Sequence, residues 1–373
     1  MARSSFIAME PTFPIPDNRA VTRSNLDPNR LDDVRRTRMT DRSAPLQQAN
    51  ARYQRDLKRL LPKADLKRAK SIVADLKRDF RQASLAARGD AAKWEAQRKA
   101  VRGKQRRLLA RAVPRYREVR ALQRRHGGQL EKLAAAWRDI HTPPIGDILE
   151  PPLDPNTTIF KPPFSLVDVY VWKGGDQHSD VTNRSFVLPD SGQLILDADF
   201  DDNEHTSFSD GLWGLLYVNI ADVVTSCGVP YTVPDAGRLR ITAEFRNFYN
   251  QALMSLRDNW GFSSGTLSCH YWLFGSVMRP SRESVQYVRL FDNKLTSDGD
   301  DVSALMPDID QSAPLYLDTT TDDSFNQGEP VWLMVGSLVE VYSRLDDMHS
   351  HVRALLWWQV NQIAVSVVPI IIL

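Results

Sequence analysis

The chain has 373 residues, enough for two or three domains, and its 42% hydrophobic and 25% charged residues are ordinary for a globular protein. The formal net charge of +2 hides a division, because residues 1–150 hold 35 Lys and Arg against 17 Asp and Glu, whereas residues 151–373 hold 13 against 29. The N-terminus lacks the apolar core of a secretory signal, and no run of about 18 apolar residues predicts a membrane-spanning helix. We expect a cytoplasmic protein, or one released without a signal peptide.

The N-terminal part of the chain divides into an arm and a helical region. Residues 1–43 are polar, contain four prolines and show no apolar periodicity, which predicts an irregular arm. Over residues 44–141 apolar side chains recur at three- and four-residue steps, which predicts helices. Gly89-Asp90, Pro114 and Gly127-Gly128 are expected to separate successive helices. The apolar stripe is narrow and favours a helical hairpin, coiled coil or small bundle.

The C-terminal part of the chain shows a different periodicity. Residues 142–165 contain seven prolines and few charges, which predicts a linker. Over residues 166–373 apolar and polar residues alternate in eight or more short runs, separated by turns rich in Gly, Asp and Ser. The sequence therefore predicts a two-domain α+β protein, in which the basic helices precede an acidic, antiparallel β-sandwich resembling a jelly roll.

The basic helical region is the first candidate binding site. Residues 51–125 hold 25 basic and 7 acidic residues. The densest cluster consists of Arg102, Lys104, Arg106, Arg107, Arg111, Arg115, Arg117, Arg120, Arg124 and Arg125. Lys and Arg side chains that contact phosphates release counterions, so nucleic acid or another polyanion is a reasonable partner. Two alternatives stay open: the acidic domain of a neighbouring subunit, or a merely solvated helix face.

Two groups of side chains were considered as metal ligands. Asp197, Asp199 and Asp201 alternate, and oxygen ligands at alternate positions suit calcium. However, an EF-hand loop that began at Asp197 would lack its glycine and its final glutamate, so alternating acids on an open strand explain the pattern equally well. His349 and His351 lack a further clear ligand, and a polar turn is expected there. We predict no metal and no cofactor.

Catalytic motifs are weak in this sequence. Residues 261–265 match the Gly-x-Ser-x-Gly pattern, but an alternating strand follows where a nucleophile elbow needs a helix. No phosphate-binding loop is present, and the seven histidines form no acid–base pattern. Cys227 and Cys269 are expected to be buried apolar residues. We therefore expect a protein that is not an enzyme.

Two tryptophans are candidates for contact with a glycan or a partner. Trp272 lies on the strand face opposite Leu267 and Cys269. Trp357 is next to Trp358 and therefore points to the other face of the same strand. A sandwich buries only its inner faces, so Trp272 and one of the pair Trp357 and Trp358 could be exposed, although packing under a loop or against another subunit is the more common fate of such residues.

The order of these regions suggests two broad functions. A basic N-terminal region followed by a jelly-roll-like domain resembles viral coat proteins, whereas helices followed by a β-sandwich also resemble some bacterial toxins exported without a signal. Our leading hypothesis is a non-enzymatic binding or assembly protein, a homo-oligomer whose helices contact a polyanion or a neighbour's acidic domain. The alternative is a toxin-like protein whose amphipathic helices act on an anionic membrane surface, with a β-sandwich that binds a receptor or glycan.

Overall fold

The computed structural model describes residues 45–138 and 154–369, with gaps at 46–47, 50, 54, 66, 70, 73–74, 77–90, 155, 176–178, 204–216, 259–263, 280–281, 299–301, 306–313 and 347. The expected arm, residues 1–43, and half of the expected linker lie outside this part of the chain. The described residues between 45 and 76 are helical except 61 and 62. Two further helices follow, α3 (Ala91–Ala112) and α4 (Tyr116–Arg138).

All strand pairs in the described chain are antiparallel and form two sheets. Sheet A has the order β10 (Val302–Leu305), β7 (Gly237–Asp258), β13 (Met348–Val368), β5 (Gln193–Asn203) and β3 (Ser179–Asn183). Three more strands pair with members of this sheet: β11 (Leu315–Phe325) with β7, β1 (Thr158–Phe160) with β13, and β4 (Phe186–Leu188) with β5. Sheet B has the order β2 (Leu166–Gly175), β6 (Tyr217–Thr232), β12 (Pro330–Asp346), β8 (Ser264–Arg279) and β9 (Arg282–Asp298). The predicted antiparallel β-domain is therefore confirmed.

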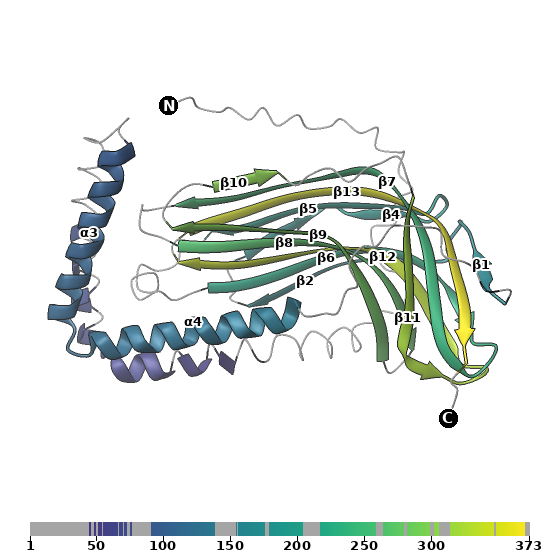
Figure 1. Cartoon of the computed structure of the whole chain (residues 1–373), viewed down its shortest axis with the longest axis horizontal. Helices are drawn as coiled ribbons and strands as arrows, with labels where there is room; N and C mark the ends of the chain where they lie inside the picture. The colour runs from purple at the N-terminus through teal and green to yellow at the C-terminus, as the bar shows by residue number, and fades with distance from the viewer. Residues whose placement is uncertain are drawn as a thin grey trace.

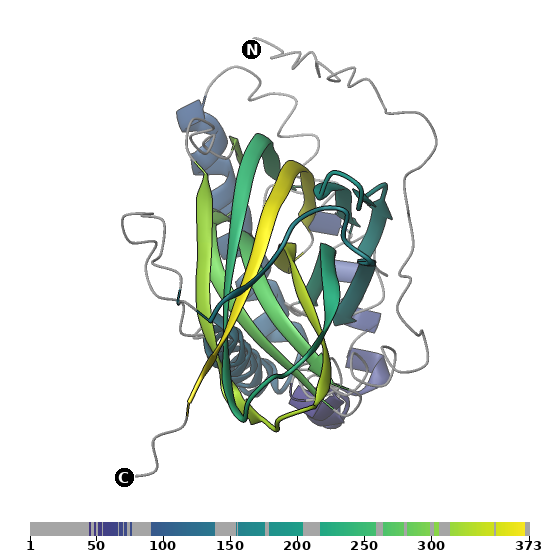
Figure 2. The same ribbon diagram turned by 90° about the vertical axis from the view of Figure 1, so that its right-hand side faces the viewer.

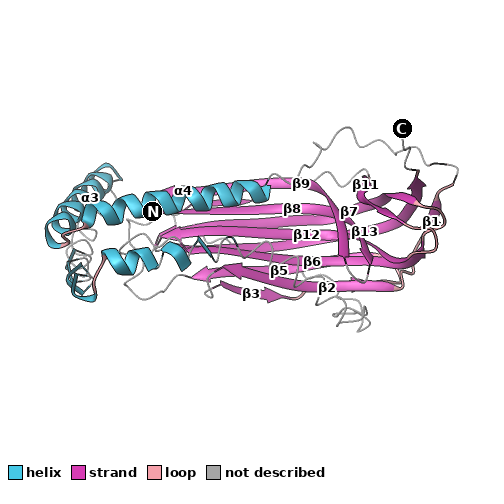
Figure 3. Cartoon of the chain, turned by 90° about the horizontal axis from the view of Figure 1, so that it is seen from below, coloured by secondary structure: helices cyan, strands magenta, loops and turns pink. Residues whose placement is uncertain are grey.

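The molecule has three layers (Figure 1). Sheet A lies on one side, sheet B lies in the middle, and α4 runs beneath sheet B, while α3 stands at one end. Seen from the helical side, α4 lies lengthwise over the strands of sheet B (Figure 3). Seen from the end of the molecule that lies away from α3, the strands of both sheets twist along their length around the core (Figure 2). Among the described helices, α4 thus lies along the outer face of sheet B, while α3 stands beyond the end of the sheets.

Strand β13 shows the alternation expected for a sheet with one open face. Its side chains are alternately buried and partly exposed from Met348 to Asn361. The inward residues, such as Leu356, Trp358 and Val360, join the core between the sheets, and the Trp358 ring packs edge-on against Phe245 at 6.3 Å. The outer face of sheet A is left open to solvent.

Strand β12 is buried on both faces. Val331, Leu333 and Val335 face the core between the sheets, whereas Met334 and Leu338 belong to separate buried clusters on the outer side. Its 17 residues form one continuous strand with both faces covered. Burial on both faces follows from the helical layer, because helices on one side of a sheet cover the face that would otherwise meet water.

Two expectations about element boundaries need correction. Helix α4 continues through Gly127-Gly128, where we expected a break. Each glycine costs about 1 kcal/mol in a helix, but Val119, Leu122 and His126 are buried along one face of α4, and this packing holds the helix together. Strand β1 lies within the expected linker, residues 142–165. The domain boundaries themselves stay a prediction.

A buried carboxylate joins the two sheets. Asp202 on β5 of sheet A is 6% exposed. Its Oδ2 atom accepts a hydrogen bond from Asn219 Nδ2 on β6 at 2.8 Å and another from Ser343 Oγ on β12. A buried charge is tolerated when donors surround it, so this network fixes how sheet A sits on sheet B.

Candidate functional site

The helical layer has an apolar core of its own. Tyr53 and Leu57, from the helical residues near position 50, pack with Leu109 of α3 and with Val119 and Leu122 of α4. In addition, Arg68 Nη1 donates a hydrogen bond to the carbonyl oxygen of Ala112 at the end of α3, at 3.2 Å. The apolar stripes of the helices therefore pack against one another, which leaves their polar sides to solvent.

His126 lies where α4 meets the neighbouring helix and sheet B. Its side chain is 5% exposed and stacks on the Tyr53 ring, with ring centroids 4.2 Å apart and planes 8° apart. Burial, helped by the positive charge of Arg344 on β12, lowers the pKa of His126 from 6.5 to about 4. The imidazole is therefore neutral at pH 7, and its protonation would oppose the docking of the helices on sheet B.

The solvent side of the helices is strongly basic. We call the following exposed side chains the basic helical face: Arg52, Arg55, Lys58, Arg59, Lys63, Lys67, Arg68, Lys93, Lys104, Arg106, Arg107, Arg111, Arg115, Arg117, Arg120, Arg124, Arg125 and Lys132. All the cationic residues singled out from the sequence belong to it except Arg102, whose side chain lies outside the described part. The structure places them on α3, on α4 and on the turn between the two helices.

Few acidic side chains neutralise this face. Among the described residues of the helical layer, the exposed carboxylates are Asp75 and Glu118. Glu118 pairs with Arg115, with Oε2 and Nη2 2.9 Å apart. Within the described chain, no carboxylate lies within ion-pair distance of Arg106, Arg111 or Arg117. The basic helical face therefore carries a large net positive charge.

Part of the acidic charge lies beneath the helices. Asp222, Glu340 and His270 are register partners on three adjacent strands of sheet B. They point to the face that the helical layer covers, and they are 2%, 9% and 2% exposed. Asp168 on β2 is buried on the same face. The acidic β-domain thus directs several carboxylates toward the basic helices of its own chain.

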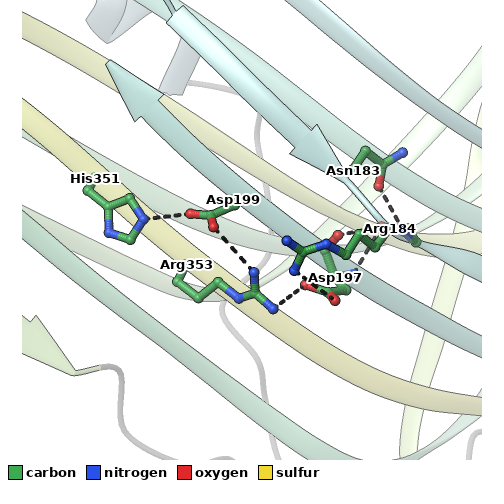
Figure 4. Close-up of polar contacts among 7 residues, drawn as sticks. Asn183, Arg184, Asp197, Asp199, His351 and Arg353 are labelled. Carbon is green, nitrogen blue, oxygen red and sulfur yellow. Dashed lines mark hydrogen bonds and ion pairs between the residues drawn. The ribbon is translucent and has the colours of Figure 1, made fainter. Parts of the chain in front are cut away.

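The open face of sheet A carries a different polar network (Figure 4). Arg353 on β13 lies between Asp197 and Asp199 of β5, with its Nη2 atom 2.8 Å from Asp197 Oδ1 and its Nη1 atom 3.3 Å from Asp199 Oδ2. His351 Nε2 contacts Asp199 Oδ1 at 2.5 Å, and His349 Nε2 contacts Asp201 Oδ1 at 2.9 Å. The alternating acids therefore meet cationic and imidazole groups on the neighbouring strand.

The structure also gives the positions of the acids and histidines that were considered as metal ligands. Asp197, Asp199 and Asp201 line the open face of a strand, and within the described residues no three His, Cys, Asp or Glu side chains are grouped so that they could hold a metal ion. The turn expected at His349 and His351 is wrong, because both lie within β13. Burial raises the pKa of Asp197 despite Arg353 and Arg184 nearby, since desolvation outweighs their attraction.

The two candidate tryptophans have different surroundings. Trp272 does lie on the outer face of sheet B, but it is packed there and not exposed, because it is 3% exposed and lies with Phe274, Leu338 and Val224 in a buried cluster. The helical layer covers this face, which the sequence of β8 could not reveal. Trp357 lies partly exposed on the open face of sheet A, where its Nε1 atom donates to Gln193 Oε1 at 3.2 Å.

Other chemical groups offer little reactivity. Cys227 and Cys269 are free and buried, as expected, and burial raises the pKa of the Cys227 thiol. Residues 261–263 of the Gly-x-Ser-x-Gly pattern lie outside the described chain. Within the helical residues that are described, none forms a helix long and apolar enough to cross a bilayer.

Comparison with known proteins identifies no family. No family model matches the chain, and no curated protein matches it significantly. Weak structural likenesses include three solved structures. Isomalto-dextranase from Arthrobacter globiformis T6 with panose is 13% identical over 45% of this chain, with a TM-score of 0.15. Tailspike protein 4 of bacteriophage CBA120 is 8% identical over 52% of this chain, with a TM-score of 0.14, and the module TmCBM61 with β-1,4-galactotriose is 8% identical over 48%, with a TM-score of 0.12. The matches span 23%, 19% and 86% of those chains. At these TM-scores the likenesses carry no argument about function.

Proposed function

We propose that this chain is a non-enzymatic binding and assembly protein whose basic helical face binds nucleic acid. The single observation that carries the proposal is the near absence of exposed carboxylates among the many exposed Lys and Arg side chains of the described helices. A stable surface of one sign is costly by itself because like charges repel, and a polyanionic partner removes that cost. Each phosphate that a cation neutralises also releases a condensed counterion.

The way in which the helices are held supports a binding role. Their apolar sides are used in the shared core with Leu57, Leu109 and Val119, and in the contact with sheet B. The cationic side chains are therefore presented by a packed layer rather than by a free helix, which lowers the entropy lost on binding. The same packing weighs against a membrane role, since the helices would first have to leave sheet B.

The strand order supports the assembly part of the proposal. The orders β5-β13-β7-β11 and β6-β12-β8-β9 are those of a jelly roll, a sandwich of two Greek keys that occurs in viral capsids and in lectins. A basic N-terminal region before such a domain also resembles the layout of viral coat proteins. Fold alone does not fix function, so the assembly of many copies around nucleic acid rests on the basic helical face together with this topology.

The first experiment is light scattering after size exclusion at low and high salt, with absorbance at 260 and 280 nm. We expect a large species that carries nucleic acid at low salt and dissociates at high salt. A monomer free of nucleic acid at both salt concentrations would contradict both parts of the proposal.

A charge-reversal variant then locates the contact. In a gel-shift titration with single-stranded RNA and with duplex DNA, the variant Arg106→Glu/Arg111→Glu/Arg117→Glu should bind far more weakly. The slope of log K against log salt should become shallower by roughly 0.7–0.9 for each lost phosphate contact. The matched control is Lys161→Glu/Arg238→Glu/Arg257→Glu, which reverses three exposed cations on or next to sheet A. Equal losses in both variants would mean that overall charge, and not the basic helical face, drives binding.

A further inference from the structure

On the open face of sheet A, two further aromatic rings, Phe248 and Tyr249, lie beside the candidate Trp357. Strands β7 and β13 are paired through a β-bulge, because Trp357 is opposite Tyr249 while Trp358 is opposite Asn247. Phe248 is the extra residue of the bulge. Its ring lies beside Trp357, with ring centroids 5.3 Å apart and planes tilted by 42°. The bulge thus adds a third ring beside Trp357 and Tyr249.

Polar side chains hold these rings in place. Gln193 Oε1 accepts the indole N–H of Trp357 at 3.2 Å, and Gln251 Oε1 accepts the Tyr249 hydroxyl. The Arg246 guanidinium lies over the Phe248 ring, 5.3 Å from its centroid. We call Trp357, Phe248, Tyr249, Arg246, Gln193 and Gln251 the aromatic platform. Its rings are fixed before any ligand arrives, which reduces the entropy cost of binding.

The amide groups of the platform keep hydrogen-bonding capacity. Both glutamines use their carbonyl oxygens to accept from the aromatic side chains. Within the described chain, no hydrogen bond is formed by the amide nitrogen of Gln193 or of Gln251. Each amide nitrogen therefore keeps two N–H donors beside an aromatic ring. Sites for small ligands are typically lined by aromatic rings, which offer apolar area, with a few fixed polar groups beside them.

The charges around the platform favour a neutral ligand. Arg353 is already held between Asp197 and Asp199, and Glu244 Oε1 accepts a hydrogen bond from Asn361 Nδ2 at 2.7 Å. The platform's one cation, Arg246, is engaged with the Phe248 ring. An ionic ligand would therefore have to compete with existing pairs, whereas a ligand rich in hydroxyl groups would not.

The small apolar area argues against a protein partner at this place. Within the described chain, the exposed large hydrophobic side chains are Ile159 and Leu305, and neither belongs to the platform. A stable protein interface buries about 800 Å² on each partner around an apolar centre. A sugar ring needs much less, because one C–H face can stack on an aromatic ring while its hydroxyls bond to amides.

We infer that the aromatic platform on the open face of sheet A binds a neutral oligosaccharide. Trp357 provides the stacking surface, and the amides of Gln193 and Gln251 donate to sugar hydroxyls. The face lies on the opposite side of sheet A from sheet B and the helices (Figure 1). The site is therefore available while the basic helical face is occupied, and it does not depend on nucleic-acid binding.

The test uses affinity electrophoresis of the full chain in native gels that contain dextran, mannan, β-galactan or β-glucan. We expect at least one polysaccharide to retard the protein. Trp357→Ala should weaken that retardation by about tenfold or more, and Gln251→Ala should weaken it by a smaller factor. The matched control is Trp332→Ala, which removes another partly exposed tryptophan, on β12 of sheet B, and should leave retardation unchanged.

Three results would overturn the inference. The first is mobility unchanged in all four gels. The second is retardation that Trp357→Ala leaves intact. The third is a change of oligomeric state in Trp357→Ala without any effect of sugars, which would make the platform a contact between copies of the chain. A gel shift with RNA, done in parallel on the same variants, separates these results from a failure of nucleic-acid binding.

Discussion

The outer faces of the two sheets have the same kind of alternating sequence but differ in their exposure to solvent. Both β8 of sheet B and β13 of sheet A alternate between core side chains and a second set that contains a tryptophan. On sheet B that second face is buried, with Trp272 3% exposed. On sheet A it stays open, with Trp357 partly exposed beside Gln193.

The difference comes from the helical layer and shows how one chain can present two unlike outer faces. The helices bury their apolar stripes together and against sheet B, so their Lys and Arg side chains point outward. No described helix covers sheet A, so its outer face keeps its aromatic platform and its paired charges. One side of the molecule is therefore suited to a polyanion and the other to a neutral ligand.

The largest expected effect on stability comes from replacing Trp272 on sheet B, and it contrasts with a small effect of replacing Trp357 on sheet A. Trp272→Ala should lower the free energy of unfolding by about 3–5 kcal/mol, because it leaves a cavity between sheet B and its cover. Trp357→Ala should cost about 1 kcal/mol, since solvent already reaches its face of the sheet. Urea unfolding followed by circular dichroism measures both. Equal losses would show that the helical layer does not cover sheet B in solution.

The next effect concerns a carboxylate between the sheets. Asp202→Ala should destabilise the fold by about 3 kcal/mol, because Asn219 and Ser343 would lose a buried acceptor. Its control is Asp318→Ala, which breaks the solvent-accessible ion pair with Arg240 and should cost about 1 kcal/mol or less. Thermal unfolding of both variants checks the contrast, and a greater loss for Asp318→Ala would contradict it.

Acidification should weaken the docking of the helices. The pKa of His126 is about 4 in the fold and 6.5 ordinarily, so the unfolded chain takes up this proton first. The contribution of neutral His126 to the free energy of unfolding is therefore fully present above pH 6.5. This contribution falls progressively, by roughly 2–3 kcal/mol in total, as the pH falls to 4. His126→Phe keeps a ring to stack on Tyr53 and should remove this part of the pH dependence. The measurement compares unfolding of the two proteins at pH 7.5, 5.5 and 4.5, and parallel curves would contradict the expectation.

The smallest expected effect lies on the open face. Arg353→Ala removes the ion pairs with Asp197 and Asp199, whose side chains are 19% and 30% exposed. We expect a loss of about 1 kcal/mol, reduced in 1 M salt, because partly exposed pairs are screened by solvent and ions. Unfolding at low and high salt measures it. A loss of several kcal/mol that is insensitive to salt would mean that this face is covered as sheet B is.

Several features of the fold could be predicted because they depend on local patterns. The period-two alternation predicted the antiparallel strands of residues 166–373, and the three- and four-residue steps predicted the helical region. The division of charge also predicted a basic helical part and an acidic β-domain. Boundaries were less predictable, since α4 continues through Gly127-Gly128, where buried neighbours outweigh the cost of glycine.

The candidate sites depended much more on contacts between distant residues. The pairs His351–Asp199 and His349–Asp201 join residues about 150 positions apart. The platform depends on a bulge that brings Phe248 beside Trp357, and no local pattern of the sequence marks it. The exposed basic residues of α3 and α4 were identified in advance as a group, because a charge cluster on a helix is visible in the sequence itself, whereas Trp357 was identified without its aromatic neighbours.

The sequence by itself determined which segments are helices or strands and where the positive charge lies, because both follow from side-chain periodicity and composition. The tertiary structure decided which sheet the helices cover, and with it whether a tryptophan on an outer face is core or surface. An alternating sequence indicates that a strand has two unlike faces, but the burial of each face depends on what packs against it. That packing is set by helices more than a hundred residues away in the chain.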